Sequence, residues 1–365
     1  MRRKTLRVVI NLVIFFAALT VIITINRPGS STSHLLSWGK IQYHHAKPAS
    51  NDHGPSGICP GLSTTLKPAL IVARVTADGD TTWLSSLADK YHICVYTADD
   101  ETDPTTSPTL RVPANRGHEA MAYLTFLIDN YASIPASGAV FVHGTRFSWH
   151  TDDPSYDNLA LLASLNVSSA VEPAGYHNMR CDWSVGTCPP NVKAQGSLET
   201  RMQAKVAPWE LRTVADAALP AAFAQIFSLE RDAENALLGS ADVLRSQCCA
   251  QFVVARDSIW QHDREEYVAL RQWLLDAAPN DDRVSGRILS YLWHVLFVRR
   301  GLVGRDGDEV DLTRLNMIAC PSAAACYCRL YGRCGLQGCR EGRCRGQYSI
   351  PPNYALPEDW EQTHA

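Results

Sequence analysis

The chain has 365 residues, of which 46% are hydrophobic and 19% charged, and its formal net charge at pH 7 is -3. These values are typical of an ordinary globular protein with one large or two modest domains. The charge balance gives no support for nucleic acid as a partner. We therefore look for function in local patterns along the chain.

Residues 1–26 predict a cytosolic tail and a signal-anchor transmembrane helix. A basic cluster is followed by an apolar run of 18 residues at positions 8–25, which is near the lower limit for crossing a bilayer. Positive charges before the span keep the N-terminus in the cytosol. We therefore expect a single-pass type II membrane protein whose body faces the Golgi or ER lumen or the cell surface. A cleaved signal peptide is the alternative, although no small-residue cleavage site follows Ile25.

Two further patterns fit a lumenal body. The chain has twelve cysteines, an even number that suits disulfide formation, and Asn166-Val167-Ser168 is an N-glycosylation sequon. Residues 27–67 are rich in Ser, Pro, Gly and His without an apolar period, which indicates a flexible stem. Cys59 within this stem is a candidate for a disulfide to the body.

Residues 68–319 alternate strand-like and helix-like segments. We expect strands at 69–75, 93–96, 139–142 and 248–254, and helices at 83–89, 159–165 and 256–275. A further Ala-rich segment at 209–227 is interrupted by Pro220, residues 175–188 read as a loop, and the apolar run 288–298 belongs in the core. This order predicts an α/β fold with a mostly parallel central sheet flanked by helices.

A helix is also predicted before the strand at 139–142. Leu124, Leu127, Ile128 and Tyr131 have the one-face spacing of an amphipathic helix. Asn115 is the expected N-cap, and Glu119 lies in the first turn, where the helix dipole favours an anion.

Residues 320–365 form a cysteine-rich segment and tail. Six cysteines lie between Cys320 and Cys344, interleaved with arginines and without a histidine. In a lumenal protein this composition favours a disulfide-stapled knot, with zinc binding as the alternative. Nearer the middle of the chain, Cys181 and Cys188 are spaced to close a small disulfide of their own.

Polar residues follow the strand at 139–142 and give the first candidate site. Imidazole and carboxylate groups suit a divalent metal, and a carboxylate pair after a strand can hold Mn or Mg against a diphosphate. The predicted metal ligands are His143, His150 and Asp152, and the predicted catalytic residues are His143, Asp152 and Asp153. The alternative is a structural turn before Pro154.

Two other sets of residues are candidates for binding a nucleotide or phosphate. Acidic turns follow the first two strands at Asp78, Asp80 and Asp99, and the helix start carries Asn115, Arg116 and Gly117. Free backbone N–H groups and an arginine suit an anion. Ordinary turns and helix capping are the alternatives. His294, in the apolar run, is interpreted as a core histidine.

Several sequence blocks, in this order, resemble a mainly fungal family known as domain of unknown function 3431. The resemblance covers roughly residues 70–297, through ARVTADGDTTWL, NRGHEAMAYLTFLIDNY, VFVHGTRFSWHTDD, GYHNMRC, CCAQFVVARDSI and GRILSYLWHVLF. The block layout is similar to that of GT-A glycosyltransferases, which implies a nucleotide-sugar donor, a glycan acceptor and Mn or Mg. The sequence departs from that pattern where His143-Gly144-Thr145 stands in place of an Asp-x-Asp.

The patterns together predict a glycosyltransferase-like enzyme of the secretory pathway. One rival is a non-catalytic binding or scaffold protein of the lumen or cell surface. The other is a histidine-metal oxidoreductase of secondary metabolism. A cleft where His143, His150, Asp152 and Asp78 meet would favour catalysis, whereas a sheet end filled by side chains would favour binding.

Overall fold

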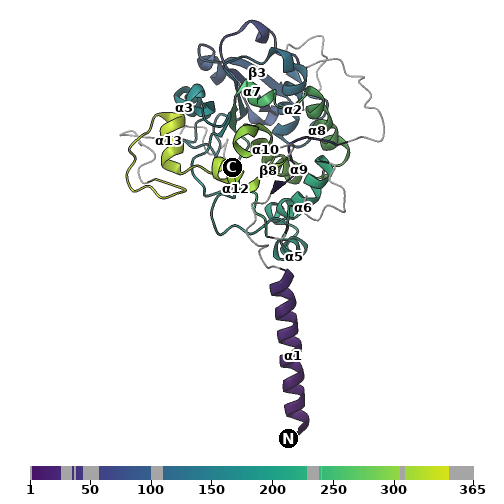
Figure 1. Ribbon diagram of the computed structural model, residues 1–365. Coiled ribbons are helices and arrows are strands. Elements are labelled where there is room, and N and C mark those ends of the chain that lie inside the picture. The colour runs from purple at the N-terminus through teal and green to yellow at the C-terminus, as the bar shows by residue number, and fades with distance from the viewer. Residues whose placement is uncertain are drawn as a thin grey trace.

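The computed structural model describes residues 2–25, 35–36, 38–43, 57–99, 110–227, 238–239, 241–304 and 309–344. Helix α1 (Arg2–Ile25) projects from the body as a single rod (Figure 1). Its stretch Thr5–Ile23 is long and apolar enough to cross a membrane and is buried nowhere in the protein. A signal sequence near the N-terminus would meet the same description. The helix is thus compatible with a single-pass anchor.

A six-stranded mixed sheet in the order β4-β3-β2-β5-β7-β6 forms the centre of the body. β2, β3, β4 and β5 run parallel, whereas β7 pairs antiparallel with β5 and with β6. The strands are β2 (Ala69–Arg74), β3 (His92–Thr97), β4 (Leu110–Arg111), β5 (Ala139–His143), β6 (Tyr176–Asn178) and β7 (Phe252–Val254). The mostly parallel α/β sheet predicted from the sequence is confirmed.

Helices cover both faces of this sheet, as its apolar strands require. Alternate residues of each strand belong to separate cores: Ile71 and Phe141 lie in one, and Val72 and Val142 lie in the other. The first core includes α2 (Glu119–Asp129), α6 (Leu211–Ile226), α8 (Arg264–Asp276), α9 (Asp282–Ser290), α10 (Trp293–Phe297) and α12 (Leu312–Ala319). The second includes α3 (Asn158–Ser164), α4 (Val167–Val171) and α13 (Ala323–Tyr331).

The remaining described elements are short connections or lie at the edges of the body. They are β1 (Leu35–Leu36), β8 (Val310–Asp311), α5 (Leu198–Val206), α7 (Arg256–Ile259), α11 (Arg300–Val303) and the 3₁₀ turns η1 (Leu62–Thr64), η2 (Thr76–Asp78), η3 (Thr82–Leu87) and η4 (Tyr131–Ser133).

The start of α2 differs from the sequence prediction. The helix begins at Glu119 and its N-cap is His118, so the prediction of Asn115 as N-cap was wrong. Gly117 and His118 both have positive φ, at 68° and 53°. The chain therefore turns sharply just before the helix, too late for Asn115 to cap it. Glu119 does occupy the first turn, as expected.

Three other segment predictions need correction. Residues 175–188 were expected to form a loop but include β6, which pairs with β7. Pro220 lies inside a continuous α6, whose buried side chains anchor both of its halves in the core. Residues 256–275 form two helices, because Asp263 and Glu266 make a capping box that starts α8.

Part of the predicted stem packs on the body. Trp38 is fully buried and its ring contacts Phe223 and Phe227 of α6, while β1 pairs with β8. The disulfide Cys59–Cys94, anticipated for Cys59, joins residues 57–67 to β3. The rest of the predicted stem lies outside the described residues.

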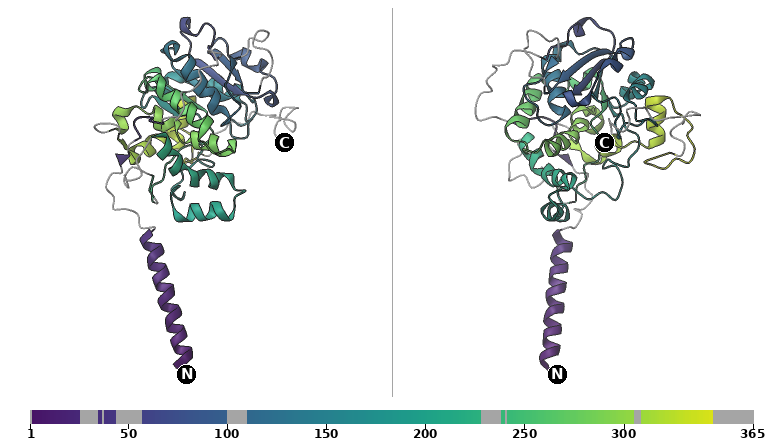
Figure 2. Two further views of the ribbon diagram at one scale, coloured as in Figure 1. Left: turned by 90° about the vertical axis from the view of Figure 1, so that its right-hand side faces the viewer. Right: turned by 180° about the vertical axis from the view of Figure 1, so that it is seen from behind.

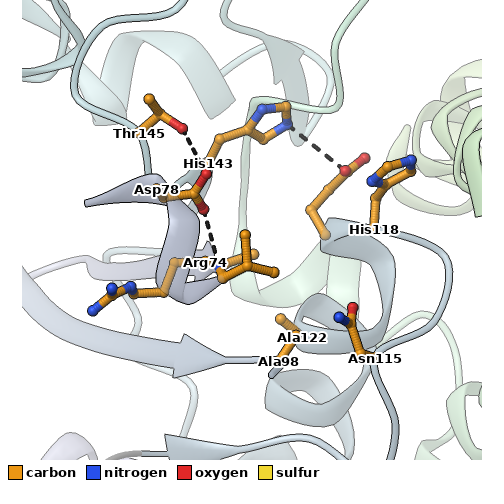
Figure 3. A pocket seen from close by; sticks show the side chains of 11 residues that line it. Arg74, Asp78, Ala98, Asn115, His118, Ala122, His143 and Thr145 are labelled. Carbon is orange, nitrogen blue, oxygen red and sulfur yellow. Dashed lines mark hydrogen bonds and ion pairs between the residues drawn. The ribbon is translucent and has the colours of Figure 1, made fainter. Parts of the chain in front are cut away.

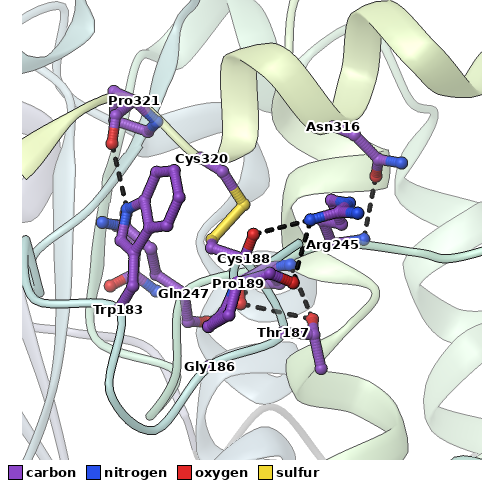
Figure 4. Close-up of a disulfide and its surroundings, with 12 residues drawn as sticks. Trp183, Gly186, Thr187, Cys188, Pro189, Arg245, Gln247, Asn316, Cys320 and Pro321 are labelled. Carbon is purple, nitrogen blue, oxygen red and sulfur yellow. Dashed lines mark hydrogen bonds between the residues drawn. A yellow bond between two sulfur atoms is a disulfide. The ribbon is translucent and has the colours of Figure 1, made fainter. Parts of the chain in front are cut away.

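All twelve cysteines are paired, which confirms a disulfide framework. The predicted bond Cys181–Cys188 is wrong, since Cys181 pairs with Cys326 and Cys188 with Cys320 (Figure 4). Both bonds join the segment before α5 to the cysteine-rich segment. The other bonds are local: Cys248–Cys249, Cys328–Cys334 and Cys339–Cys344.

Hydrogen bonds reinforce this covalent connection. The Arg245 guanidinium donates to the carbonyl oxygens of Cys188 and Pro189, and the Trp183 indole N–H donates to the carbonyl of Pro321 (Figure 4). The cysteine-rich segment is therefore fastened to the α/β body at several points.

Candidate functional site

A pocket of about 200 Å³ lies at the carboxyl ends of β2 and β5, beside the start of α2. Ligands of open α/β sheets gather beyond this edge of the strands. Its polar lining consists of Arg74, Asp78, Asn115, His118, Glu119, His143 and Thr145, and its apolar lining of Ala73, Val75, Ala98 and Ala122. Figure 3 shows these side chains around the pocket.

Glu119 is the buried carboxyl of this pocket. It begins α2, whose next nine residues are all buried, so the backbone holds its side chain at the edge of the core. Only 15% of that side chain is exposed. Burial, partly offset by a hydrogen bond from its own backbone N–H, raises the pKa of Glu119 to about 7. The carboxyl thus changes charge near neutral pH.

His143 faces Glu119 from the last position of β5. Its Nε2 lies 3.9 Å from a carboxylate oxygen of Glu119, which is longer than a hydrogen bond (Figure 3). Burial lowers the pKa of His143 to about 4, opposed by the negative charge of Asp78. The imidazole is therefore neutral at physiological pH, and its Nε2 has no hydrogen-bond partner among the described residues.

His150 lies beside His143 but is not among the residues that line the pocket. Its ring stacks edge-on against His143 with centroids 4.9 Å apart, and burial lowers its pKa to about 3. The two predicted histidine ligands are therefore neighbours, both in the neutral form that can bind a metal.

The turn before Glu119 is clamped by the α8–α9 connection. The Arg116 guanidinium donates to backbone carbonyls between Leu274 and Asn280 and pairs with Asp282, whose carboxylate also accepts from the Gly117 N–H. The guanidinium of Arg116 and the N–H of Gly117 are thus engaged within the protein. Of the three predicted phosphate ligands at this helix start, Asn115 lines the pocket.

Predicted acidic ligands order the neighbouring turns. Asp78 lines the pocket and accepts hydrogen bonds from the Thr145 hydroxyl at 3.0 Å and from the Val75 N–H at 2.9 Å. Asp99 accepts from the N–H and hydroxyl of Thr76. Asp80 accepts from Thr82 in its own turn. Asp78 is therefore the predicted acid that the fold brings to His143.

Asp152 and Asp153 are not among the residues that line this pocket. The Asp152 carboxylate accepts from the N–H of Cys181 at 2.7 Å and from the Tyr327 hydroxyl at 2.9 Å. Asp153 accepts from the N–H of Ser155 within a turn. The structure thus assigns both carboxylates bonds that shape the chain, and brings His143 together with Asp78 and Glu119.

A metal site needs several donor atoms close to one another. Within the described ranges, the set of three that lies within 4.8 Å is Cys59, His92 and Cys94, and both sulfurs of that set form a disulfide. Near the pocket, Glu119 and His143 offer one oxygen and one unpartnered nitrogen. The carboxylate oxygen suits Mn or Mg, whereas an imidazole nitrogen is more typical of Zn, Cu, Fe or Ni, so this pair alone fits Mn or Mg only in part.

Asn166, the predicted glycosylation site, lies on the surface. Its side-chain oxygen accepts from the Ser169 N–H as the N-cap of α4. An exposed asparagine at a helix start is accessible to a glycan.

Glu119 and His118 were not singled out as site residues from the sequence. A usable signal was present, because the ten residues from Glu119 to Ile128 contain one charged side chain and are otherwise almost entirely apolar. A helix that is apolar on all sides is buried. The carboxyl that opens the helix is then largely buried too, and burial without hydrogen-bond donors raises a carboxyl's pKa.

The chain belongs to the family described as Protein of unknown function (DUF3431), whose model matches residues 70–329. The matched region contains the whole pocket and the first cysteines of the C-terminal segment. No curated protein and no solved structure matches the chain. The family membership predicted from the sequence blocks is confirmed, and it carries no described activity.

Proposed function

We propose that this protein is a glycosyltransferase-like enzyme of the secretory pathway, anchored by α1 with its body in the lumen, and that Glu119 is its acid–base group. The observation that carries this proposal is the largely buried Glu119 carboxyl. It has a pKa of about 7 and faces a neutral His143 in a pocket at the strand ends. Perturbed carboxyls in clefts are typical of acid–base catalysis.

In the proposed reaction, ionised Glu119 accepts the proton of an acceptor hydroxyl. The hydroxyl oxygen forms a bond to the anomeric carbon of the donor sugar, and the bond from that carbon to the diphosphate breaks. His143 lies opposite Glu119 at 3.9 Å and its neutral ring can donate or accept a hydrogen bond to the reacting sugar. Asp78 is held by Thr145 at the same strand ends.

A divalent ion remains part of the proposal. Asp78 and His143, which line the same pocket, would hold Mn or Mg together with substrate oxygens, and Glu119 would stay free to act as the base. The ion would stabilise negative charge on the departing diphosphate. The pocket of about 200 Å³ is smaller than the roughly 300–1,000 Å³ of drug-sized ligand sites. It therefore suits the sugar end of a nucleotide sugar better than the whole molecule.

The proposal is tested by thermal-shift screening of the purified full-length chain with nucleotide sugars, with and without Mn, followed by assays for transfer and donor hydrolysis. A stabilising donor that is consumed by the wild type and not by Glu119→Gln supports the proposal. Glu265→Gln, at a surface ion pair, is the matched control. No shift and no turnover with any donor would count against sugar transfer.

The lumenal orientation has its own test. In cells, an enzyme that removes N-glycans should increase the electrophoretic mobility of the wild type and leave Asn166→Gln unchanged. A body that never carries the glycan while its N-terminus is shown to be lumenal would contradict the type II orientation.

A further inference from the structure

Three large apolar side chains gather on the surface at α5. Met202 and Val206 are four residues apart on one face of this helix, and Trp209 follows in the next turn. Their exposed fractions are 57%, 75% and 74%. Single exposed apolar residues are ordinary. Three large ones within eight residues indicate an interaction surface.

The position of α5 indicates what that partner is. The views agree that α5 lies at the end of the body from which α1 projects, and that it runs across the direction of α1 rather than along it (Figures 1 and 2). A helix that lies flat on a bilayer has this orientation relative to a spanning helix.

The length of the connection limits how far this end of the body can be from the membrane. α1 ends at Ile25 and β1 begins at Leu35, so ten steps of extended chain span at most about 36 Å. Residues 38–43 then pack along α6, where Trp38 contacts Phe223 and the Gln42 N–H donates to Ile226. Helix α6 in turn packs against α5.

The side chains around the three apolar residues suit a lipid headgroup region. Arg201 and Lys205 are exposed on α5, and their long stems can keep the charges in water while the apolar side chains enter the lipid. Tryptophan is the residue most characteristic of membrane interfaces, together with tyrosine. The nearby Glu210 carboxylate is engaged with Gln203.

We propose that Met202, Val206 and Trp209 insert into the lumenal leaflet of the membrane that α1 spans, so that the body rests on the bilayer. This inference rests on the anchored topology of the proposed function. It places the sheet end near β3 and α2, where the pocket lies, on the side of the body away from α1 (Figure 1). The pocket then lies in the part of the body that is farther from the lipid.

The test uses the full-length chain in phosphatidylcholine nanodiscs, with and without lipids brominated on their acyl chains, which quench nearby tryptophans. Bromination should quench part of the wild-type emission, and Trp209→Phe should lose that quenchable part. Trp260→Phe should keep it, because this half-exposed tryptophan directly follows α7, which lies near β3 on the side of the body away from α1 (Figure 1). Met202→Asp with Val206→Asp should reduce the quenching while Trp209 remains.

Failure of the inference and failure of the anchor give different results. Extraction of the chain from membranes by alkaline carbonate would show that α1 is not an anchor and would overturn both. Retention of the chain, with equal quenching in wild type and Trp209→Phe, would overturn the membrane contact alone. Protection of α5 in cross-linked pairs of chains, without quenching, would assign the surface to a second copy and also overturn it.

Discussion

Glu119, whose side chain is 15% exposed, and Asp152, which is fully buried, are two carboxyls in opposite situations. Asp152 receives hydrogen bonds from the Cys181 N–H and the Tyr327 hydroxyl, so its charge is compensated inside the fold. Glu119 receives one from its own backbone, and burial raises its pKa to about 7. A compensated carboxylate holds structure together, whereas an uncompensated one is available for chemistry. The difference lies in their partners and not in their residue type.

The largest expected effect is on catalysis, and it follows from replacing Glu119, the carboxyl without compensating donors. Once a substrate is found, Glu119→Gln should lower kcat about 10²- to 10⁴-fold, the range typical of a lost acid–base group, while the chain stays folded. Asp152→Asn should retain far more activity, because the proposed reaction does not use it. Steady-state kinetics and circular dichroism on both variants check this. Equal losses would remove the distinction between the two carboxyls.

The second effect concerns the covalent framework around Asp152. The disulfide Cys181–Cys326 lies beside both Asp152 donors and joins positions 145 residues apart. Cys188–Cys320 remains and closes most of that separation, so the bond constrains a loop of about 15 residues in the unfolded chain. Replacing both cysteines with alanine should lower the free energy of unfolding by about 3 kcal/mol, because the unfolded chain gains conformational freedom.

The matched control is Cys328–Cys334, which joins positions 6 residues apart. Its removal should cost about 0.5 kcal/mol less, since a shorter loop constrains the unfolded chain less. Denaturant melts of both double variants decide the question, and equal losses would contradict the account.

The third effect removes the compensated carboxyl itself. Asp152→Ala leaves the Cys181 N–H and the Tyr327 hydroxyl without their acceptor, and should lower the free energy of unfolding by about 3 kcal/mol. Denaturant titration at pH 7 measures it. The Tyr327→Phe variant should lose less, because it removes one donor and leaves the N–H bonds in place. Wild-type stability of Asp152→Ala would show that this carboxylate is dispensable.

The smallest effect is on the pH dependence of the free energy of unfolding. The folded protein holds the Glu119 proton up to about pH 7 whereas the unfolded chain releases it near 4.5, so this group's contribution to stability falls as pH rises through that window. His143, with its pKa lowered to about 4, contributes in the opposite sense between about pH 4 and 6.5.

Comparing Glu119→Gln with the wild type separates the contribution of Glu119 to the pH dependence of stability from that of His143. The stability of Glu119→Gln relative to wild type should increase between pH 4.5 and 7.5, by roughly 2–3 kcal/mol at about 1.4 kcal/mol per pKa unit. Urea melts across this range provide the measurement. A difference that stays constant with pH would mean that Glu119 has an ordinary pKa.

Much of the fold could be predicted from the sequence. The apolar runs at 69–75 and 139–142 predict buried strands, and their spacing by helical segments predicts a parallel sheet. The edges were less predictable. β6 has three residues inside a polar segment, and its pairing with β7 depends on residues some 70 positions away. Such pairings leave no local pattern.

The candidate site could be predicted only in part, because distant residues also decide its details. His143 and Asp78 follow strands that the sequence reveals, so their meeting at one sheet edge could be anticipated. The role of Asp152 depends on Tyr327, 175 positions away, and Arg116 is engaged by a connection more than 150 positions away. Sequence patterns identify the carboxyls and guanidinium groups, but their compensation is decided by distant partners.

The central claim is that Glu119 is an uncompensated carboxyl that changes charge near neutral pH. Infrared difference spectroscopy of the full-length chain, titrated from pH 5 to 9, tests it directly through the C=O stretch of a protonated carboxylic acid. The account predicts a band that disappears with a midpoint near pH 7 in the wild type and is absent from Glu119→Gln. Spectra of the two proteins that coincide throughout this range would contradict it.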